Sequence, residues 1–342
     1  MSVLRIEDLS IALPAGGERE YAVDGLSLNI ESGQTLCVVG ESGSGKSVMA
    51  MAIMGLLAHG LNVRRGSIEL HSEQLLQVSA QRWRQLRGVA MGMVFQEPMT
   101  ALNPVMSCGA QLDELLRFHT ELDAEQRRAE VLSMLERVKL PHAPEVARRF
   151  PHQLSGGQRQ RIVIAMAMML KPALLICDEP TTALDVTTQK EILALIQELQ
   201  REQGSAVLFI THDMGVVAEI ADRVLVMHQG RCVEAGAKHQ VLKTPQAPYT
   251  QALLAAVPGM QPPAPRAAST KAVVLSAQSL GKTYTSRDWM GRTSSHEALT
   301  QASLALRAGE TVGVVGESGS GKSTLARCLM RSEEHTSELQ SH

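Results

Sequence analysis

The sequence predicts an α/β fold in which helices cover both faces of a parallel sheet. Short apolar runs bounded by turn residues alternate along the chain with segments of helical periodicity. Strands joined through helices pair in parallel and are buried on both faces. The composition agrees, because 342 residues with 44% hydrophobic and 20% charged side chains suit a globular chain of one large domain or two.

The elements follow in chain order. The first 35 residues alternate apolar and polar side chains, which predicts a small antiparallel sheet. Core strands are expected at 36–39, 91–96, 174–178, 207–210 and 223–227, and helices at 46–57, 124–138, 157–170, 188–200 and 214–220. The stretch 98–170 has helical patterns and no strand, which indicates a helical insertion into the core. Short strands and a helix, ending near 257, are expected after Gln229.

The sequence contains an internal repeat. GESGSGKS begins at Gly40 and again at Gly316, and the preceding residues match almost position for position. A Pro- and Ala-rich stretch between the copies is typical of a linker. We therefore expect a complete domain at 1–257, a linker at 258–271 and the truncated start of a second domain at 272–330.

The final residues, 331–342, are polar and show no apolar periodicity. They resemble the translation of a sequencing-library adapter, so we expect a non-native tail, with a natural polar C-terminus as the alternative. If the repeat was once complete, the natural protein would be about twice as long.

Composition excludes several classes of function. The net charge of −2 and the 3% aromatic content argue against a nucleic-acid partner. The longest apolar run, 162–170, is far shorter than the about 20 residues that a membrane span needs, and the acidic start does not resemble a signal peptide. The five cysteines are scattered, so we expect reduced thiols in a cytosolic chain without a structural metal or iron–sulfur cluster.

The first glycine-rich loop stands between an apolar strand and a helical pattern. This is the context of a phosphate-binding loop, because glycines let backbone N–H groups turn inward and the helix N-terminus favours an anion. Lys46 would reach the β- and γ-phosphates and Ser47 would hold Mg²⁺. A ligand-free glycine turn is the alternative. The expected nucleotide-binding residues are Gly40, Ser42, Gly43, Ser44, Gly45, Lys46 and Ser47, repeated at Gly316, Ser318, Gly319, Ser320, Gly321, Lys322 and Ser323.

Polar residues follow three of the predicted strands. Asp178 and Glu179 end an apolar run and would lie at the carboxyl edge of the sheet, beside the phosphate loop. Asp178 is expected in the Mg²⁺ shell and Glu179 as the general base that polarises water, unless the pair is merely solvated. His212 would contact the γ-phosphate and orient Glu179, and Gln96 would sense Mg²⁺ or water. A structural histidine is the alternative for His212.

The segment LSGGQ opens a long helix and predicts a second anion site. Ser155, Gly156, Gly157 and Gln158 combine a hydroxyl, close backbone approach and a helix N-terminus. One nucleotide does not need two phosphate cradles, so this one would serve a nucleotide held by a different module. A serine that only caps its helix is the alternative.

In this order, and with Ala183-Leu-Asp185, the motifs resemble the Walker A, Q-loop, signature, Walker B, D-loop and H-loop of ABC transporter ATP-binding subunits. The resemblance covers 1–330. It implies a P-loop NTPase with a RecA-like parallel core, an N-terminal antiparallel β subdomain and a helical signature subdomain. Two such modules face each other head to tail and enclose two ATP molecules with Mg²⁺.

Further segments are similar to the dipeptide/oligopeptide/nickel importer branch: FQEPMTALNP, FPHQLSGGQRQR, DEPTTALDVTTQ, THDMGVVAEIADRV and PQAPYTQALLAAVP. The tandem layout is similar to that of fused glutathione and peptide importers. The chain departs from the family in three ways. It lacks the cysteine-rich stretch of many members, and its second module has no Q-loop, signature, Walker B or H-loop. The adenine-stacking aromatic is also ambiguous, with Leu13 at the usual place, Tyr21 nearest and Tyr284 in the second copy.

The resemblance implies an ATPase that energises uptake of peptides or a related solute such as glutathione. Nickel or opine import, or a non-transport ABC ATPase, are the alternatives. The implied partners are transmembrane permease subunits, indirectly a solute-binding protein, and a second ATP-binding module: its own missing half, another copy or a paralogue. The implied location is peripheral, at the cytoplasmic face of a bacterial inner membrane.

Overall fold

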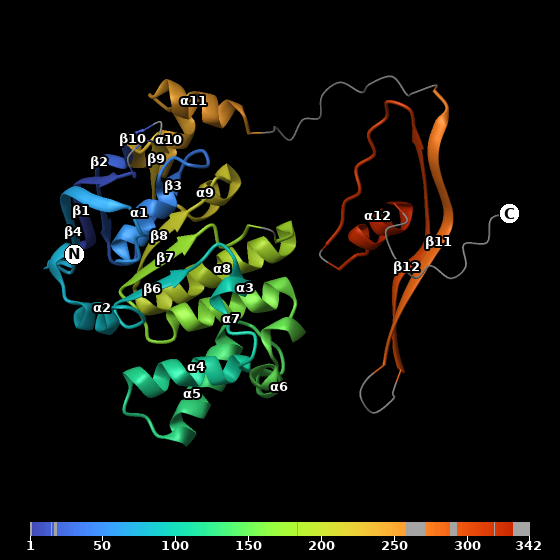
Figure 1. Cartoon of the computed structure of the whole chain (residues 1–342), viewed down its shortest axis with the longest axis horizontal. Coiled ribbons are helices and arrows are strands. Elements are labelled where there is room, and N and C mark those ends of the chain that lie inside the picture. The colour runs from blue at the N-terminus through green and yellow to red at the C-terminus, as the bar shows by residue number, and fades with distance from the viewer. Residues whose placement is uncertain are drawn as a thin grey trace. The chain divides into compact units, whose positions relative to one another are not determined.

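The computed structural model describes residues 2–14, 16, 19–182, 184–257, 271–287, 293–317 and 319–330. In the first part of the chain a six-stranded sheet forms the centre (Figure 1). Its strand order is β10-β9-β3-β8-β7-β6, and the five strands from β9 to β6 pair in parallel while β10 is antiparallel to β9. The bounds are β3 Thr35–Val39, β6 Met91–Val94, β7 Leu174–Asp178, β8 Ala206–Ile210, β9 Arg223–His228 and β10 Arg231–Ala237. The predicted α/β class is confirmed.

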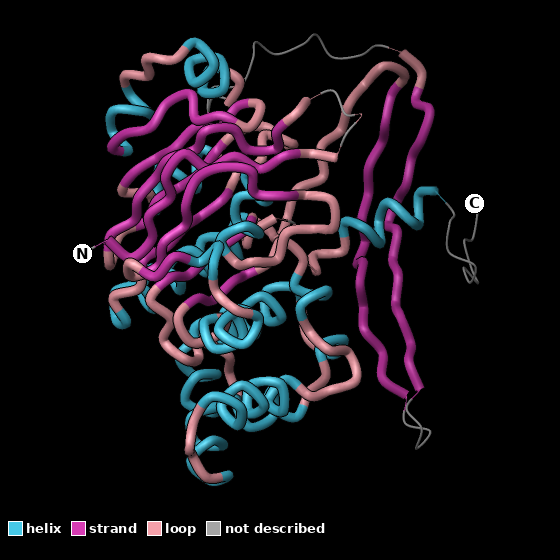
Figure 2. The backbone as a smooth tube through the Cα atoms, turned by 60° about the vertical axis from the view of Figure 1, so that its left-hand side comes forward, coloured by secondary structure: helices cyan, strands magenta, loops and turns pink. Residues whose placement is uncertain are grey.

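Both faces of this sheet are covered. Cys37 and Val39 of β3 belong to one buried cluster, whereas Leu36 and Val38 belong to another. Because side chains alternate along a strand, the two clusters lie on opposite faces. Helices stand on both sides of the strands in Figure 2. The continuous apolar strand sequences follow from this double burial.

A separate antiparallel sheet contains the two strands that the alternation of the first 35 residues predicts, together with two strands from residues 62–74 that were not predicted. Its order is β2-β1-β4-β5, with bounds β1 Ser2–Ala12, β2 Tyr21–Glu31, β4 Asn62–Leu70 and β5 Glu73–Gln74. The buried side chains of β1 and β2 join the same cluster as Leu36 and Val38. This sheet therefore packs on one face of the central sheet.

Helices fill the rest of the first part. Those of the core are α1 Lys46–Ile53, α2 Ala80–Leu86, α7 Gly156–Met168, α8 Val186–Gln203 and α9 Met214–Ile220. The stretch after β6 is helical, as expected, with α3 Pro98–Ala101, α4 Cys108–His119, α5 Ala124–Arg137 and α6 Ala143–Arg148. The C-terminal extension adds α10 Lys238–Lys243 and α11 Pro248–Ala255. Short 3₁₀ turns lie at Leu75–Gln77 and Pro151–Gln153.

Several element boundaries differ from expectation. Helix α1 ends at Ile53 rather than 57, because Gly55 adopts a positive φ of 62°, which stops a helix. Helix α8 starts at Val186, runs to Gln203 and stops before Gly204, with φ 70°. Strand β6 ends at Val94, so Gln96 lies in the loop beyond the strand.

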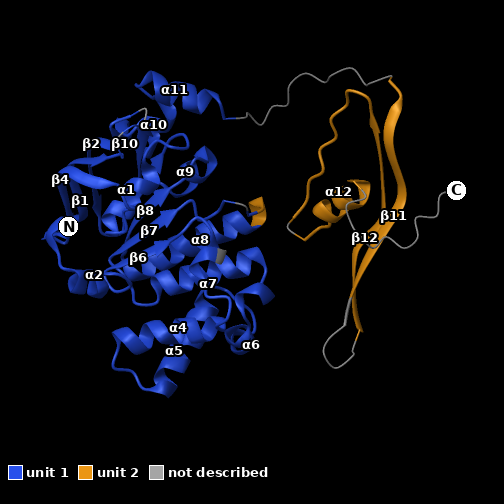
Figure 3. Cartoon of the chain, in the orientation of Figure 1, with its two compact units in different colours: residues 1–184, 188–258 blue, residues 185–187, 259–342 orange. Residues whose placement is uncertain are grey.

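The chain divides into two compact units, Met1–Leu184 with Thr188–Pro258 and Asp185–Thr187 with Gly259–His342 (Figure 3). The second unit contains an antiparallel pair, β11 Val273–Arg287 and β12 Thr293–Arg307, followed by α12 Lys322–Met330. Of the expected linker only Lys271 is described, and the expected tail 331–342 lies outside the described residues.

The repeat in the sequence is only partly a repeat in structure. Residues 311–317, which match β3 and the start of its loop, form no strand and are exposed. In the first unit β3 is paired on both sides by β8 and β9, and the described residues of the second unit provide no equivalent of either. Without partners an apolar strand has nothing to complete its backbone hydrogen bonds.

No helix in the described ranges has the length and apolar content to cross a bilayer.

Candidate nucleotide-binding site

The loop between β3 and α1 forms a closed cradle around its own lysine. Lys46 is only 5% exposed, and its Nζ donates to the carbonyl oxygens of Gly40 and Glu41, each at 2.8 Å, and to Ser44 Oγ at 3.3 Å. Burial lowers the pKa of this amine, while the nearby Glu179 and Asp178 carboxylates oppose the shift. Gly43 lies in the same loop with φ 77°, and Ser42 is exposed there.

Glycine is required at both ends of this loop. A Cβ on Gly40 would lie 2.1 Å from the Met227 carbonyl oxygen, and one on Gly45 would lie 2.3 Å from that of Ala22. Both residues also have positive φ, 150° and 102°. The loop therefore packs closely between the end of β9 and the start of β2.

Asp178 stands at the end of β7, directly beside the start of α1. Ser47 Oγ donates to Asp178 Oδ1 at 3.1 Å, as expected for two residues meant to share an ion. Burial raises the pKa of Asp178, and the hydrogen bond from Ser47 opposes that shift. A hydroxyl and a carboxylate are the hard oxygen donors that Mg²⁺ prefers, so these residues fit that ion.

Glu179 is the meeting point of three strand ends. Gln96 Nε2, after β6, donates to Glu179 Oε2 at 3.2 Å, and His212 Nδ1, after β8, lies 3.3 Å from Glu179 Oε1. The Glu179 side chain is 18% exposed, whereas His212 is 63% exposed. Glu179 has a positive φ of 49° and its N–H donates to the carbonyl of Ile210. The structure thus brings together the three residues that the sequence placed at strand ends.

One member of this cluster was not found from the sequence. Thr182 Oγ1 donates to Glu179 Oε2 at 3.0 Å, so the oxygen that Gln96 binds has a second donor. The signal was the hydroxyl three residues after a strand-end glutamate, in EPTT. Such a residue folds back on the turn that follows the strand.

The LSGGQ segment is a separate cluster at the start of α7. Ser155 Oγ accepts from the Gln158 N–H at 3.3 Å, and Gln158 Oε1 accepts from the Ser155 N–H at 3.1 Å. This capping box is the geometry of the simple N-cap alternative. A Cβ on Gly157 would lie 2.7 Å from Thr188 Cγ2, so glycine allows α7 and α8 to approach. Gly156 is the first residue of α7, and Ala183 of the D-loop lies outside the described residues.

Within the described part of the chain, no hydrogen bond joins Ser155 or Gln158 to the cluster around Lys46 or Glu179. Ser155 is exposed. In addition to its internal cap, the start of a helix retains backbone N–H groups for an external acceptor.

The second glycine loop repeats the lysine geometry. Lys322 Nζ donates to the carbonyls of Gly316 and Glu317, each at 2.7 Å, and to Ser320 Oγ at 3.4 Å. Gly319 and Gly321 have positive φ, Ser323 is exposed in α12, and Ser318 lies outside the described residues. The lysine is less buried than Lys46, because the loop has no paired strand before it.

The turn between β1 and β2 touches the first loop. Arg19 Nη2 donates to the Gly43 carbonyl at 2.9 Å, and the Leu13 N–H donates to the Glu20 carbonyl. Leu13 and Tyr21 are both partly buried at this turn, and Tyr284 lies in the second unit. The adenine-stacking residue stays unassigned among them.

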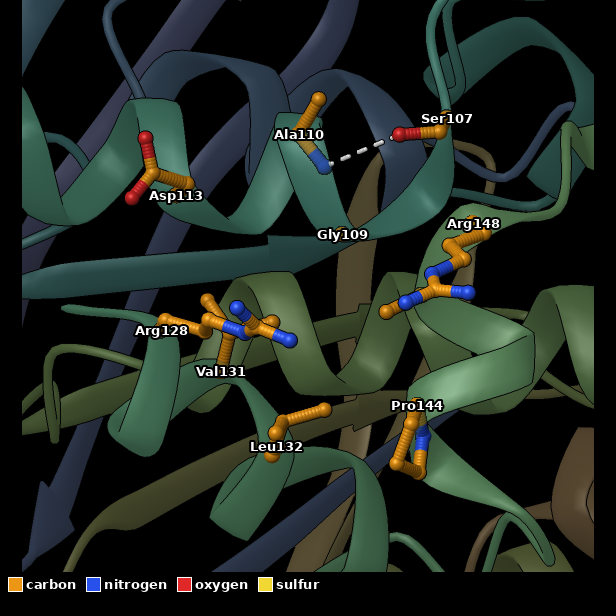
Figure 4. Close-up of a pocket in the computed structure, with 10 residues that line it drawn as sticks. Ser107, Gly109, Ala110, Asp113, Arg128, Val131, Leu132, Pro144 and Arg148 are labelled. Atoms are coloured by element: carbon orange, nitrogen blue, oxygen red, sulfur yellow. Dashed lines mark hydrogen bonds between the residues drawn. The ribbon is translucent and has the colours of Figure 1, made fainter. Parts of the chain in front are cut away.

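A cavity of about 420 Å³ lies in the helical insertion (Figure 4). None of the residues that line it belongs to the glycine loops or to the cluster around Glu179. Gly109, Ala110 and Asp113 of α4 face Val131 and Leu132 of α5 across it. The remaining lining residues are Ser107, Arg128, Pro144, Ala147 and Arg148. It is an apolar hollow edged by two arginines and one aspartate.

Comparison with known protein families shows which family this chain belongs to. The model described as "ABC transporter" matches residues 23–182 and 299–339, more than half of the chain. The chain belongs to the ABC transporter family. A second model, the "Oligopeptide/dipeptide transporter, C-terminal region", matches residues 233–292, which include the extension with α10 and α11.

ABC relatives match nearly the whole chain. It is 46% identical over 362 residues to the glutathione import ATP-binding protein GsiA of Escherichia coli K12, and 45% identical over 361 residues to that of Pectobacterium atrosepticum. The alignment with the first covers 96% of this chain and 58% of that protein. The chain thus spans well under two thirds of the length of these relatives.

Solved ABC cassettes share the fold. The dimeric cassette MJ0796 bound to ADP and Pi is 28% identical with a TM-score of 0.61, covering 69% of this chain and 98% of that one. Clostridium perfringens cbiO1, described as part of an ABC transporter complex, has the same identity and TM-score and covers 71% of this chain and 91% of that one. These likenesses confirm the cassette fold of this ABC family member.

Proposed function

We propose that this chain binds and hydrolyses ATP and energises an ABC importer for peptides or a related small solute. The observation that carries the proposal is the convergence of Gln96, Glu179 and His212 at one sheet edge, together with the contact of Ser47 with Asp178 in the same nucleotide region. A binding-only module would not need a carboxylate held by an amide and a threonine hydroxyl. General-base catalysis does need such a held carboxylate.

Nucleotide binding would use groups that the loop already presents. The backbone amides of the loop and of the start of α1 would donate to a phosphate tail, and Lys46 would transfer its hydrogen bonds from the Gly40 and Glu41 carbonyls to the β- and γ-phosphates. Ser47, Asp178 and Gln96 would hold Mg²⁺. The ion supplies positive charge that neutralises the phosphates when it is bound.

Hydrolysis would depend on Glu179. Its carboxylate would accept a proton from a water molecule as that water's oxygen bonds to the γ-phosphorus and the bond to ADP breaks. Gln96 and Thr182 hold one oxygen of Glu179, which leaves its geometry fixed during the transfer. His212 stands beside the other oxygen and would orient the carboxylate and contact the γ-phosphate.

The LSGGQ segment, of which Ser155 is exposed, would complete the site of another module. Ser155, Gly156, Gly157 and Gln158 would clamp the γ-phosphate held by the partner's loop, and this module's loop would receive the partner's LSGGQ. ATP would then bind the closed pair more tightly than the open one and shift that population. The partner module would be a missing half, another copy or a paralogue.

The solute class follows from the relatives rather than from this chain's site. The relatives compared above are named for glutathione import, and the C-terminal family model is named for oligopeptide and dipeptide transport. We therefore propose a peptide-like solute, with glutathione included in that class. A solute-binding protein and the permeases would select it. Mg²⁺ and ATP are the only small ligands proposed for this subunit.

The helical insertion is the proposed contact with the membrane partner. It begins at α3, shortly after Gln96, so a movement at the nucleotide would be passed into these helices. Its hollow between α4 and α5, edged by Arg128 and Arg148, would receive an apolar cytoplasmic segment with an acidic end from the permease. The subunit would then sit peripherally at the cytoplasmic face of the inner membrane.

An affinity-tagged chain expressed in its host is expected to co-purify two hydrophobic permease subunits. Arg148→Glu should reduce their recovery because it reverses charge at the hollow, whereas Arg201→Glu on α8 should not. Quantitative mass spectrometry of the eluates measures this. Recovery of ribosomal or DNA-repair proteins in place of permeases would contradict the import assignment and favour a non-transport ABC ATPase.

A further inference from the structure

The C-terminal extension is fastened to the central sheet by a carboxylate. Glu234 of β10 accepts the N–H of Gln246 at 2.8 Å and that of Ala247 at 3.1 Å, directly before α11. Desolvation by itself would raise the pKa of Glu234, but these amide hydrogen bonds lower it below its ordinary value. The start of α11 is therefore fixed relative to β10, whose partner β9 backs the phosphate loop.

Tyr249 links the start of α11 to the phosphate loop. It lies in the first turn of α11, and its ring centroid is 4.0 Å from that of His228, the last residue of β9. The Tyr249 hydroxyl accepts the backbone N–H of Glu41 at 3.2 Å. Because the ring rests on His228, the position of the hydroxyl is set by the sheet and not by a free side chain.

Glu41 is held from two sides. Its N–H donates to Tyr249, and its carbonyl accepts from Lys46 Nζ at 2.8 Å. The adjacent turn after β9 contributes a further contact, since the Gly230 N–H donates to the Ser44 carbonyl at 3.0 Å. When Lys46 turns to a phosphate, the Glu41 carbonyl loses that partner. The Ser44 N–H, 3.2 Å from the Glu41 carbonyl oxygen, then remains within the loop, and the bond from the Glu41 N–H to Tyr249 joins this residue to the C-terminal extension.

We propose that Tyr249 is a positioning residue of the nucleotide site, through which the C-terminal extension fixes the first turn of the phosphate loop. The inference rests on the proposed nucleotide binding. It makes the extension a part of the nucleotide site and not only an appendage of the fold. A preorganised loop binds its ligand with less ordering cost, so loss of the hydroxyl weakens nucleotide binding.

The test compares Tyr249→Phe with the wild type in the full chain. The substitution keeps the ring on His228 and removes only the hydroxyl. Binding is measured with a fluorescent, non-hydrolysable ATP analogue and Mg²⁺, and kcat and KM with ATP. One neutral hydrogen bond corresponds to about a two- to tenfold change, so Kd and KM are expected to rise by that factor while kcat stays near the wild-type value.

Thr244→Val is the matched control. It also removes one hydroxyl hydrogen bond from the extension, to the Gln240 carbonyl at 3.1 Å, but not one to the loop. Its Kd is expected to equal that of the wild type. Circular dichroism and the melting temperature show whether each variant keeps its fold, and Tyr249→Leu, which also removes the ring, is measured alongside.

The outcomes separate the two claims. Equal Kd values for Tyr249→Phe and the wild type would overturn the inference, as would a loss confined to Tyr249→Leu, since the ring alone would then act. A fall in kcat of the same size as the rise in KM would show general damage and would also overturn it. A wild-type chain that binds no analogue would refute the proposed function instead.

Discussion

Replacing Glu179 by Gln is expected to lower ATP turnover by about 10²- to 10⁴-fold, the usual contribution of a general base. The amide keeps the size of the side chain but cannot accept the proton of the attacking water. The loop, Lys46 and the Ser47–Asp178 contact are unchanged, so nucleotide binding is retained. ATP then persists, and the chain is expected to accumulate as an ATP-bound dimer, detected by phosphate release and size-exclusion chromatography.

Glu219→Gln is the matched control for this substitution. Glu219 is an exposed residue of α9, so turnover and elution should equal those of the wild type. Wild-type turnover in Glu179→Gln would remove Glu179 from the role of base. Loss of turnover without any trapped dimer would leave the base in place but count against closure on a second module.

Lys46→Met is expected to weaken ATP binding by about 10- to 100-fold, since hydrogen bonds from a charged group contribute about 1.5–3 kcal/mol. Methionine keeps most of the apolar stem of a side chain that is 5% exposed, so the loop should remain packed. What is lost is the positive charge that would reach the phosphates. Isothermal titration calorimetry with Mg²⁺ and a non-hydrolysable analogue measures the change.

The same substitution at Lys243 is the control for charge alone. Lys243 is exposed at the end of α10, and Lys243→Met should leave the Kd unchanged. An unchanged Kd in Lys46→Met would mean that this loop is not the nucleotide cradle.

Much of the site could be predicted because it is encoded locally. The glycine pattern of residues 40–47 is a single short segment. Gln96, Glu179 and His212 follow strands that are parallel neighbours in the sheet, so they lie at the same edge. Their roles remain proposals, but their convergence follows from sheet topology. The continuous apolar strand sequences likewise predict the two buried clusters, one on each face of the central sheet.

Contacts between distant segments could not be predicted. The bond from Glu41 to Tyr249 joins residues 208 positions apart, and no periodicity marks either partner. The contact of Thr182 with Glu179 is different, because it spans three residues and the hydroxyl in EPTT is its local signal. The copied loop at Gly316 retains its local geometry, but residues 311–317 form no strand, because a strand depends on neighbours that the repeat alone does not supply.

In the proposed mechanism, Ser155 and its neighbours act on a nucleotide bound by another chain. Ser42→Cys and Ser155→Cys are placed on separate, differently tagged chains in which the accessible Cys232 and Cys328 are replaced by serine and Glu179 by Gln. A short bismaleimide then reports whether the phosphate loop of one chain meets the LSGGQ segment of the other. Ser27→Cys, at an exposed position of β2, replaces Ser155→Cys in the control pair.

With Mg²⁺ and ATP, we expect a crosslinked species that carries both tags, formed by the Ser42/Ser155 pair, absent from the Ser27 pair and lost when ATP is omitted. Equal crosslinking with and without nucleotide, or none while both chains bind ATP, would contradict the account.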